Sequence, residues 1–438
     1  MSPESLGILL LLALLVAIFI GFPIAFTLIV LALVFGYIGV GLQVFSLMVF
    51  QFFSVMQESV LAAVPLFIFM GVLLEQGGLM DRLFRAFQLM LAPVRGSLYL
   101  AVMFTATIFA AATGIVGASV TLLGLMASPA MKRSGYDVRL SAGIITAGGT
   151  LGILIPPSVM LVVMGPVVGV SVVDLFAAAI VPGLVLSSLF TAYAMVRSFL
   201  NPRLGPPLAT VERATSYGAV VRELAVGLVP PAVLVGASLG SILSGLATPT
   251  EGAAMGAAGA LVLTLAYRRL GWRKLYVAVM QTVEVSAMVL FLAAASNFFG
   301  AVFSRLGTPQ MITETVAALQ LPPLGILLII MVLIFLLAWP LEWVPIVLII
   351  VPILLPVLRD LKIDLVWFCM LVAVNLQTAW LSPPVALSAY FLKGVVPDWD
   401  LKDIYLGMMQ FMVLQVVGLF LVLLFPQLAL WLPSVLFD

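Results

Sequence analysis

The sequence has no histidine, a single cysteine and few charged residues. With Cys369 alone and no histidine, zinc sites, Cys/His nucleophiles and disulfide frameworks are nearly excluded. Charged residues make up 8% of the 438 residues and the formal net charge is +1, which argues against nucleic acid as a partner. The common metal and thiol enzyme classes are therefore not expected.

Apolar residues dominate instead. They make up 64% of the chain, and the mean hydropathy of +1.30 lies far outside the range of a soluble domain. These values predict an all-α polytopic membrane protein. The first residues, Met-Ser-Pro-Glu-Ser-Leu, lack the basic region of a cleaved signal peptide, so the first apolar run is expected to remain as a membrane helix. Residues 41–58, rich in Phe and Gln, are typical of an amphipathic interfacial helix.

Apolar segments recur along the whole chain, and four of them are interrupted by glycine, proline or polar residues. The uninterrupted segments lie at residues 6–20, 24–40, 60–77, 175–197, 224–243, 250–267, 275–297 and 404–430. The interrupted segments lie at residues 94–131, 138–170, 322–358 and 365–395.

The basic residues favour one topology, in which segments 94–131 and 322–358 are reentrant hairpins and both termini are periplasmic. Only three of the 19 basic residues then lie outside, namely Arg305, Arg359 and Lys362. The cytoplasmic set is Arg82, Arg85, Arg95, Lys132, Arg133, Arg139, Arg197, Arg203, Arg213, Arg222, Arg268, Arg269, Arg273, Lys274, Lys393 and Lys402. If either hairpin crossed the membrane fully, this asymmetry would be lost.

The two halves of the chain carry the same landmarks. Pro156-Pro157 recurs as Pro383-Pro384 at an offset of 227 residues, and in each half a predicted hairpin precedes the double proline. We therefore predict two inverted-topology repeats, each with a reentrant hairpin and a broken transmembrane helix. The first repeat, with its scaffold and arm helices, is expected at 1–197, a cytoplasmic linker at 198–223 and the second repeat at 224–438.

The broken helices are candidate binding sites. Residues 148–158, Gly-Gly-Thr-Leu-Gly-Ile-Leu-Ile-Pro-Pro-Ser, combine three glycines with two prolines, so backbone groups need other partners at membrane depth. The second break, residues 375–385, carries Asn375, Gln377, Thr378 and Ser382. Half-helix N-termini after the prolines carry partial positive charge, so a carboxylate could bind here without a buried arginine.

The hairpin turns face these breaks. Thr113 and Ser119 flank a turn of small residues, and their hydroxyl oxygens are suited to Na⁺, although small residues also serve simple helix packing. Glu342 is the acid within the second hairpin, where a carboxylate is costly unless it is paired or binds a cation. It could bind a cation, carry a proton, act as a hinge residue, cap a helix or snorkel to the outer surface. Trp343 and Trp380 are interpreted as interface residues or substrate contacts.

At these residues the chain resembles the large membrane subunit of the tripartite ATP-independent periplasmic (TRAP) transporters. The matching segments are Gly-Phe-Pro at 21–23, Pro-Leu-Phe-Ile-Phe-Met-Gly at 65–71, Ser-Pro-Ala-Met-Lys-Arg-Ser-Gly-Tyr-Asp at 128–137, Ala-Gly-Gly-Thr-Leu-Gly-Ile-Leu-Ile-Pro-Pro-Ser at 147–158, Thr-Pro-Thr-Glu at 248–251 and Pro-Ile-Leu-Leu-Pro at 352–356. The resemblance implies a Na⁺-coupled importer of organic acids in the bacterial inner membrane, with an elevator-like motion. It also implies two partners, a small membrane subunit (DctQ-like) and a periplasmic substrate-binding protein.

The resemblance also implies site residues. The first Na⁺ site would comprise Thr113, Gly117, Ser119, Gly149 and Thr150. The second Na⁺ site would comprise Glu342, Trp343, Pro345, Thr378 and Ser382. The substrate would contact Ser119, Pro156, Pro157, Ser158, Asn375, Gln377, Pro383 and Pro384.

The second hairpin departs from the common Phe-Leu-Asp pattern of the family, since residues 340–343 read Pro-Leu-Glu-Trp. This form is similar to a branch associated with 2-oxo acids, lactate and other monocarboxylates. Pro340 is an addition to the pattern that leaves the local geometry of the hairpin open.

Three other functions compete with this hypothesis. A self-sufficient anion carrier of the same architecture would take its substrate directly, without a binding protein. A passive channel would not need paired inverted breaks. An intramembrane hydrolase would need a histidine base or two membrane aspartates, and the sequence offers neither.

Overall fold

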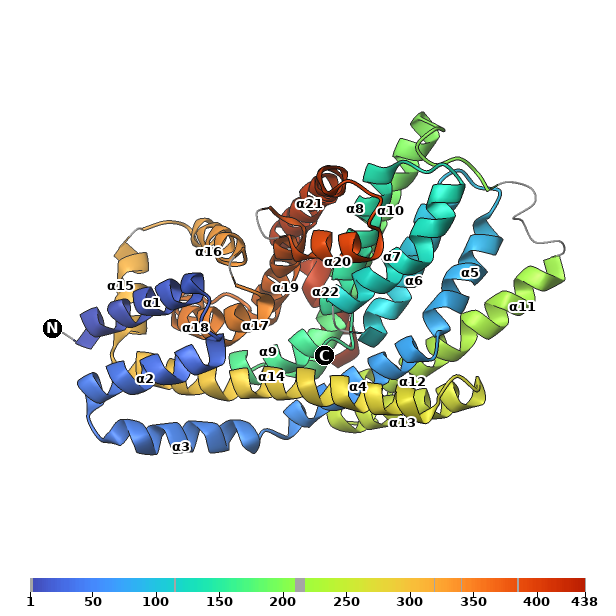
Figure 1. Ribbon diagram of the computed structural model, residues 1–438. Helices are drawn as coiled ribbons and strands as arrows, with labels where there is room; N and C mark the ends of the chain where they lie inside the picture. Colours follow the sequence, from blue (N-terminus) through green and yellow to red (C-terminus); the bar gives the residue numbers. More distant parts are fainter. Residues whose placement is uncertain are drawn as a thin grey trace.

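The computed structural model describes residues 3–113, 116–208, 217–318, 320–339, 341–383 and 386–437, and within these ranges it is helical without any strand (Figure 1). In the first half the helices are α1 (Pro3–Ile20), α2 (Ile24–Val40), α3 (Gln43–Met56), η1 (Ser59–Ala62), α4 (Ala63–Gln76), α5 (Leu79–Leu91), α6 (Ser97–Thr113), α7 (Val116–Arg133), α8 (Val138–Thr150), η2 (Leu151–Ile153), α9 (Val159–Val168) and α10 (Val172–Leu200). In the second half they are α11 (Tyr217–Gly227), α12 (Val229–Leu243), α13 (Pro249–Ala266), α14 (Trp272–Arg305), α15 (Thr308–Ala318), α16 (Pro323–Leu337), α17 (Trp343–Pro345), η4 (Ile346–Ile350), α18 (Val351–Asp360), α19 (Leu365–Leu381), α20 (Leu387–Val395), α21 (Leu401–Leu424) and α22 (Gln427–Phe437).

The chain is a multi-pass membrane protein. Seven helical stretches within the described residues are long and apolar enough to cross a membrane. In α1 only 22% of the spanning window is buried inside the protein, and Phe19 and Ile20 are largely exposed. A helix that is apolar all round and so little covered by protein faces lipid. Figure 1 shows the 34-residue α14 running beneath the core of shorter helices.

Hairpin 1, made of α6 and α7, starts and ends on the same side as predicted. The Ser97 hydroxyl, at the start of α6, shares a hydrogen bond of 3.3 Å with the hydroxyl of Tyr136, which follows α7. The backbone N–H of Leu98 donates to the same Tyr136 hydroxyl. The hairpin runs from 97 to 133, against the predicted 94–131. Its tip, at residues 114–115, lies outside the described residues.

Hairpin 2, made of α16, α17, η4 and α18, runs from 323 to 360, against the predicted 322–358. Its second arm packs on α15, the helix directly before its first arm, so both ends of the hairpin lie together. The five residues of η4 form a π-helix, a form often found at functional sites. Pro340, whose effect on this hairpin the sequence left open, lies outside the described residues.

The two repeats match residue by residue at the predicted offset of 227. Asp137 caps the N-terminus of α8 by accepting a hydrogen bond from the third residue after it, and Asp364 caps α19 in the same way. Pro129 lies inside α7, and its equivalent, Pro356, lies inside α18. The repeats also pack reciprocally, because α7 contacts α20 while η4 and α18 contact α9. The double prolines therefore identified the correct register.

The segment between the repeats follows the predicted linker in part. Helix α10 extends to Leu200 and α11 begins at Tyr217, so the last part of the predicted linker, 198–223, is helical. Residues 201–208 lie against the base of hairpin 1, where the Gly96 N–H donates to the Gly205 carbonyl. Residues 209–216 lie outside the described part of the chain.

Candidate functional site

The first break brings hairpin 1 into backbone contact with α8. A Cβ added to Gly149 would lie 2.3 Å from Val120 Cγ2 and 3.1 Å from the Val120 backbone nitrogen, so only glycine allows this approach. Gly117 is equally close to α20, because a Cβ there would lie 2.7 Å from the Phe391 ring. Ser119 lies on the same part of α7 and is buried. Thr150, at the end of α8, is buried as well. Four of the five residues predicted for the first cation site therefore lie at this junction.

The fifth residue, Thr113, ends α6, and its side chain lies outside the described part of the structure. The double proline of this break is buried, together with Ser158. The Ser158 hydroxyl donates to the Ile153 carbonyl over 2.6 Å, which closes the loop between η2 and α9.

The second break presents a chain of hydroxyl and carbonyl groups. Thr378 Oγ1 donates to the Asn375 carbonyl over 2.5 Å, and Ser382 Oγ donates to the Thr378 carbonyl over 2.6 Å. Each hydroxyl donates its proton to a backbone carbonyl, so the lone pairs of its oxygen remain available as acceptors. Asn375 Nδ2 donates to the Met331 carbonyl over 2.7 Å, which fixes α19 to the first arm of hairpin 2.

A hydrogen-bond chain joins the two breaks. Thr150 Oγ1 shares its proton between the Ala147 carbonyl, at 2.8 Å, and Gln377 Oε1, at 3.3 Å, and Gln415 Nε2 of α21 donates to the same glutamine oxygen over 2.8 Å. All three side chains are fully buried. The sequence analysis missed Gln415, although a glutamine in the middle of the apolar segment 404–430 was a usable signal.

Three buried amide atoms at this junction have no hydrogen-bond partner among the described residues. They are Asn375 Oδ1, Gln377 Nε2 and Gln415 Oε1. Two of the three are oxygens, and a buried oxygen without a donor fits a hard cation or a bound polar molecule. No group of three His, Cys, Asp or Glu side chains that could hold a metal ion occurs in the described part of the chain.

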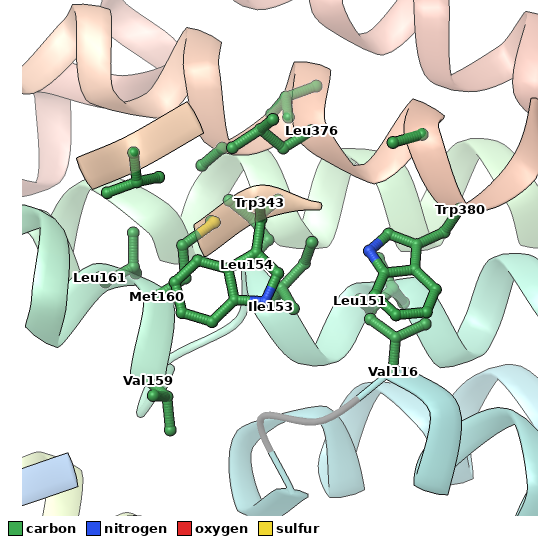
Figure 2. Close-up of a cluster of buried hydrophobic side chains, with 14 of the residues drawn as sticks. Val116, Leu151, Ile153, Leu154, Val159, Met160, Leu161, Trp343, Leu376 and Trp380 are labelled. Atoms are coloured by element: carbon green, nitrogen blue, oxygen red, sulfur yellow. The ribbon is translucent and has the colours of Figure 1, made fainter. Parts of the chain in front are cut away.

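Residues beside the turns of the two hairpins line a small cavity of about 130 Å³. Val116, the first residue of α7, and Trp343, its equivalent at an offset of 227, both line it. Trp380 of α19 completes the inner wall, and Figure 2 shows its indole and that of Trp343 around the segment that joins α8 to α9. The outer wall comes from α4 and α14, through Ile68, Val285, Met288 and Val289.

Glu342 is the one charged residue among the described residues that line this cavity. It occupies the N-cap position of α17, but its side chain makes no capping hydrogen bond. The residue is exposed, whereas the neighbouring Trp343 and Pro345 are buried. Capping a helix, one of the roles that the sequence left open for Glu342, is therefore not observed. The carboxylate is available to a ligand.

None of the described residues that were predicted to contact substrate lines the small cavity. Pro156, Ser158, Asn375 and Gln377 are buried beside it, and Pro383 is exposed. Pro384 lies outside the described residues. The amide side chains of Asn375 and Gln377 bind hairpin 2 and the other repeat instead.

A larger cavity of about 510 Å³ lies between α3, α14, α9 and hairpin 2. Its polar side is a cluster around Asn297, whose Nδ2 donates to Gln51 Oε1 over 2.8 Å and to Ser54 Oγ over 2.9 Å. This cluster fixes the arm helix α3 to α14, within which Asn297 lies.

Comparison with known proteins agrees with this geometry. Residues 11–428 match the family described as tripartite ATP-independent periplasmic transporter, DctM component. The C4-dicarboxylate TRAP transporter large permease protein DctM of Rhodobacter capsulatus is 30% identical over 403 residues, covering 88% of this chain and 89% of that protein. The ectoine TRAP transporter large permease protein TeaC of Halomonas elongata is 26% identical over 401 residues, covering 91% of each.

A solved structure shares the fold. The Alcanivorax borkumensis YdaH transporter, described as having an unusual topology, aligns with a TM-score of 0.67 at 17% identity, covering 97% of this chain and 98% of that one. These relatives are transporters and permeases, not enzymes. From the match over nearly the whole chain, and from the paired hairpins and breaks, the chain belongs to the DctM family of tripartite ATP-independent periplasmic transporters.

Proposed function

We propose that this chain is the permease subunit of a Na⁺-coupled transporter that imports a small organic acid by an elevator-type movement. The observation that carries the proposal is the cavity beside the turns of the two hairpins, where equivalent residues of the two repeats face one acidic side chain. Hairpin tips and broken helices leave backbone carbonyls and helix ends free for small ions and an anion.

The hydroxyl and carbonyl oxygens at both breaks support Na⁺ as the coupling ion. Thr378 and Ser382 keep acceptor lone pairs after donating to the backbone, and Asn375 Oδ1 is buried without a partner. Hard cations prefer such oxygen ligands. The first Na⁺ would bind where Ser119 and Thr150 meet, and the second between Glu342 and the end of α19.

The cavity supports a small substrate. Its walls are apolar apart from Glu342, and its volume of about 130 Å³ suits an acid of few atoms. A monocarboxylate or 2-oxo acid would place its short apolar part against Trp343 and Trp380, and helix ends and bound Na⁺ would balance its charge. The related permeases carry C4-dicarboxylate, ectoine and sialic acid in their names, so the family alone leaves the substrate class open.

The walls of this cavity come from two separate groups of helices, an arrangement that is compatible with an elevator movement. The inner wall comes from the two hairpins and the broken helices, which contact each other across the repeats. The outer wall belongs to α4 and α14, and α14, with 34 residues, is about 50 Å long, longer than a bilayer core is thick. The inner group would slide along this scaffold, with both chain termini on the periplasmic side of the inner membrane.

The proposal includes two partners, a small membrane subunit and a periplasmic substrate-binding protein. One relative, the isethionate permease protein DctMQ of Oleidesulfovibrio alaskensis, exceeds this chain greatly in length, since the match covers 52% of it. The alternative is a self-sufficient carrier that takes the anion directly.

Uptake by proteoliposomes tests the proposal. We expect uptake of the labelled acid only with an inward Na⁺ gradient, the small subunit and a loaded binding protein. Uptake that needs Na⁺ but no binding protein would favour the self-sufficient carrier, and uptake without Na⁺ would refute the coupling.

A further inference from the structure

A third cavity lies away from the proposed transport site, between α5, α11 and the connection from α13 to α14. Its volume is about 460 Å³, and four arginines line it together with Asp81 and Glu223. We call it the arginine cavity, and its arginines are Arg82, Arg85, Arg222 and Arg269. Neither the hairpins nor the breaks contribute to it.

The cavity is held together by specific contacts between its three segments. The guanidinium carbon of Arg82 lies 4.5 Å above the centre of the Tyr267 ring. The Tyr267 hydroxyl donates to the Val226 carbonyl over 2.6 Å. Gly227 allows α11 to approach α5, because a Cβ there would lie 2.9 Å from the Arg82 carbonyl oxygen. These contacts fix α5, the end of α11 and Tyr267, the residue after α13, to one another around the cavity.

Positive charge exceeds negative charge around this cavity. Four arginines face two carboxyl groups, and among the described residues none of the four arginines makes an ion pair within 4.0 Å. Burial raises the pKa of Asp81, and the charge of Arg269 opposes part of that rise. An anion entering the cavity would therefore meet an excess of guanidinium groups over carboxylates, and guanidinium binds phosphate in a bidentate geometry.

Three candidate membrane spans begin or end beside the cavity. One candidate membrane span ends at Gln76, directly before α5, and two others begin at Val220 and at Trp272. The C-terminal end of the first span and the N-terminal ends of the other two therefore lie beside the cavity, as expected for a site at the depth of lipid headgroups. Trp272 and Tyr276 are 83% and 60% exposed, and such aromatic side chains prefer the membrane interface.

We propose that the arginine cavity binds the phosphate of an anionic phospholipid in the cytoplasmic leaflet. Basic pockets between membrane helices at this depth are suited to anionic headgroups. The exposed Val226 at the rim would contact the apolar part of the lipid. The bound lipid would join α5 to α11 across the junction of the two repeats.

Native mass spectrometry of the detergent-solubilised full chain tests this proposal. Phosphatidylglycerol is titrated against the wild type, the double variant Arg85→Gln/Arg222→Gln, and the matched control Arg95→Gln, an exposed arginine outside the cavity. Phosphatidylcholine and free glycerol phosphate are the ligand controls. The two substituted arginines are exposed, so the double variant is expected to fold, which its melting temperature checks.

We expect at least a tenfold loss of phosphatidylglycerol affinity in the double variant and no loss in Arg95→Gln. Phosphatidylcholine should bind the wild type at least tenfold more weakly than phosphatidylglycerol. Equal affinity in the wild type and the double variant would overturn the proposal. Saturation by glycerol phosphate at the same concentration would also overturn it, since the site would then select a free phosphate.

Discussion

Thr150 and Gln377 are equivalent residues of the two repeats, 227 positions apart, and they hydrogen-bond to each other over 3.3 Å. Equivalent residues can touch only near the axis that relates the repeats. The contact therefore places both breaks beside that axis, fully buried. Gln415, which donates to the same Gln377 oxygen, holds the Gln377 amide in the orientation that accepts from Thr150.

Gln415→Leu tests this connection. The substitution removes one hydrogen bond, worth about 0.5–1.5 kcal/mol, together with a buried oxygen that has no partner, so the two effects on stability offset each other. We expect a melting temperature close to that of the wild type and uptake reduced at least tenfold. Gln427→Leu, the same change at an exposed position of α22, is the control. Normal uptake in Gln415→Leu would show that the connection is dispensable.

Gly149→Ala should separate hairpin 1 from the first break. The new methyl group would overlap Val120 Cγ2 and press on the Val120 backbone, so the hairpin must shift. Overpacking of this kind typically costs about 1–3 kcal/mol. We expect a lower melting temperature and a weaker apparent Na⁺ affinity in uptake. Gly394→Ala, where nothing lies within 4 Å of the new Cβ, should behave as the wild type, and matching behaviour of the two variants would contradict the packing argument.

Glu342→Gln tests whether the carboxylate serves transport by its charge. The side chain makes no capping bond and faces the cavity, so glutamine fits without disturbing α17. We expect the Na⁺ concentration for half-maximal uptake to rise at least tenfold, while Glu342→Asp retains partial activity. An unchanged Na⁺ titration of Glu342→Gln would remove this residue from the cation site.

Thr378→Ala and Ser119→Ala test the two proposed cation sites separately. Each removes one hydroxyl oxygen near a break, and for Thr378 the lost hydroxyl is one that donates to the Asn375 carbonyl. We expect each variant to weaken the Na⁺ dependence of uptake several-fold. Thr313→Ala, which removes a hydroxyl that donates to the backbone of α15 away from the breaks, is the control. If both titrations match that of the control, the site assignment fails.

Much of this architecture was predictable from the sequence, because helix breakers act on the residues next to them in the chain. Clusters of glycine and proline disfavour a continuous helix, so the breaks and both hairpins were placed within a few residues of their bounds. The prolines at 156 and 383 also gave the repeat offset, which the capping residues Asp137 and Asp364 confirm. Helix ends were less exact, and the helical start of α11 fell within the predicted linker.

The directions of the side chains were not accessible, because α19 is buried on every side and its polar residues cluster at one end, so the sequence pattern does not show which neighbour each one contacts. Asn375 and Gln377 were therefore assigned to substrate, whereas the fold directs them to hairpin 2 and to Thr150. The sequence by itself determined a membrane protein of two repeats with broken helices, since composition and helix breakers act locally. Only the tertiary structure decided that the two breaks touch, that residues beside both hairpin turns line one cavity with Glu342, and that four distant arginines share another, because each depends on packing between segments far apart in the chain.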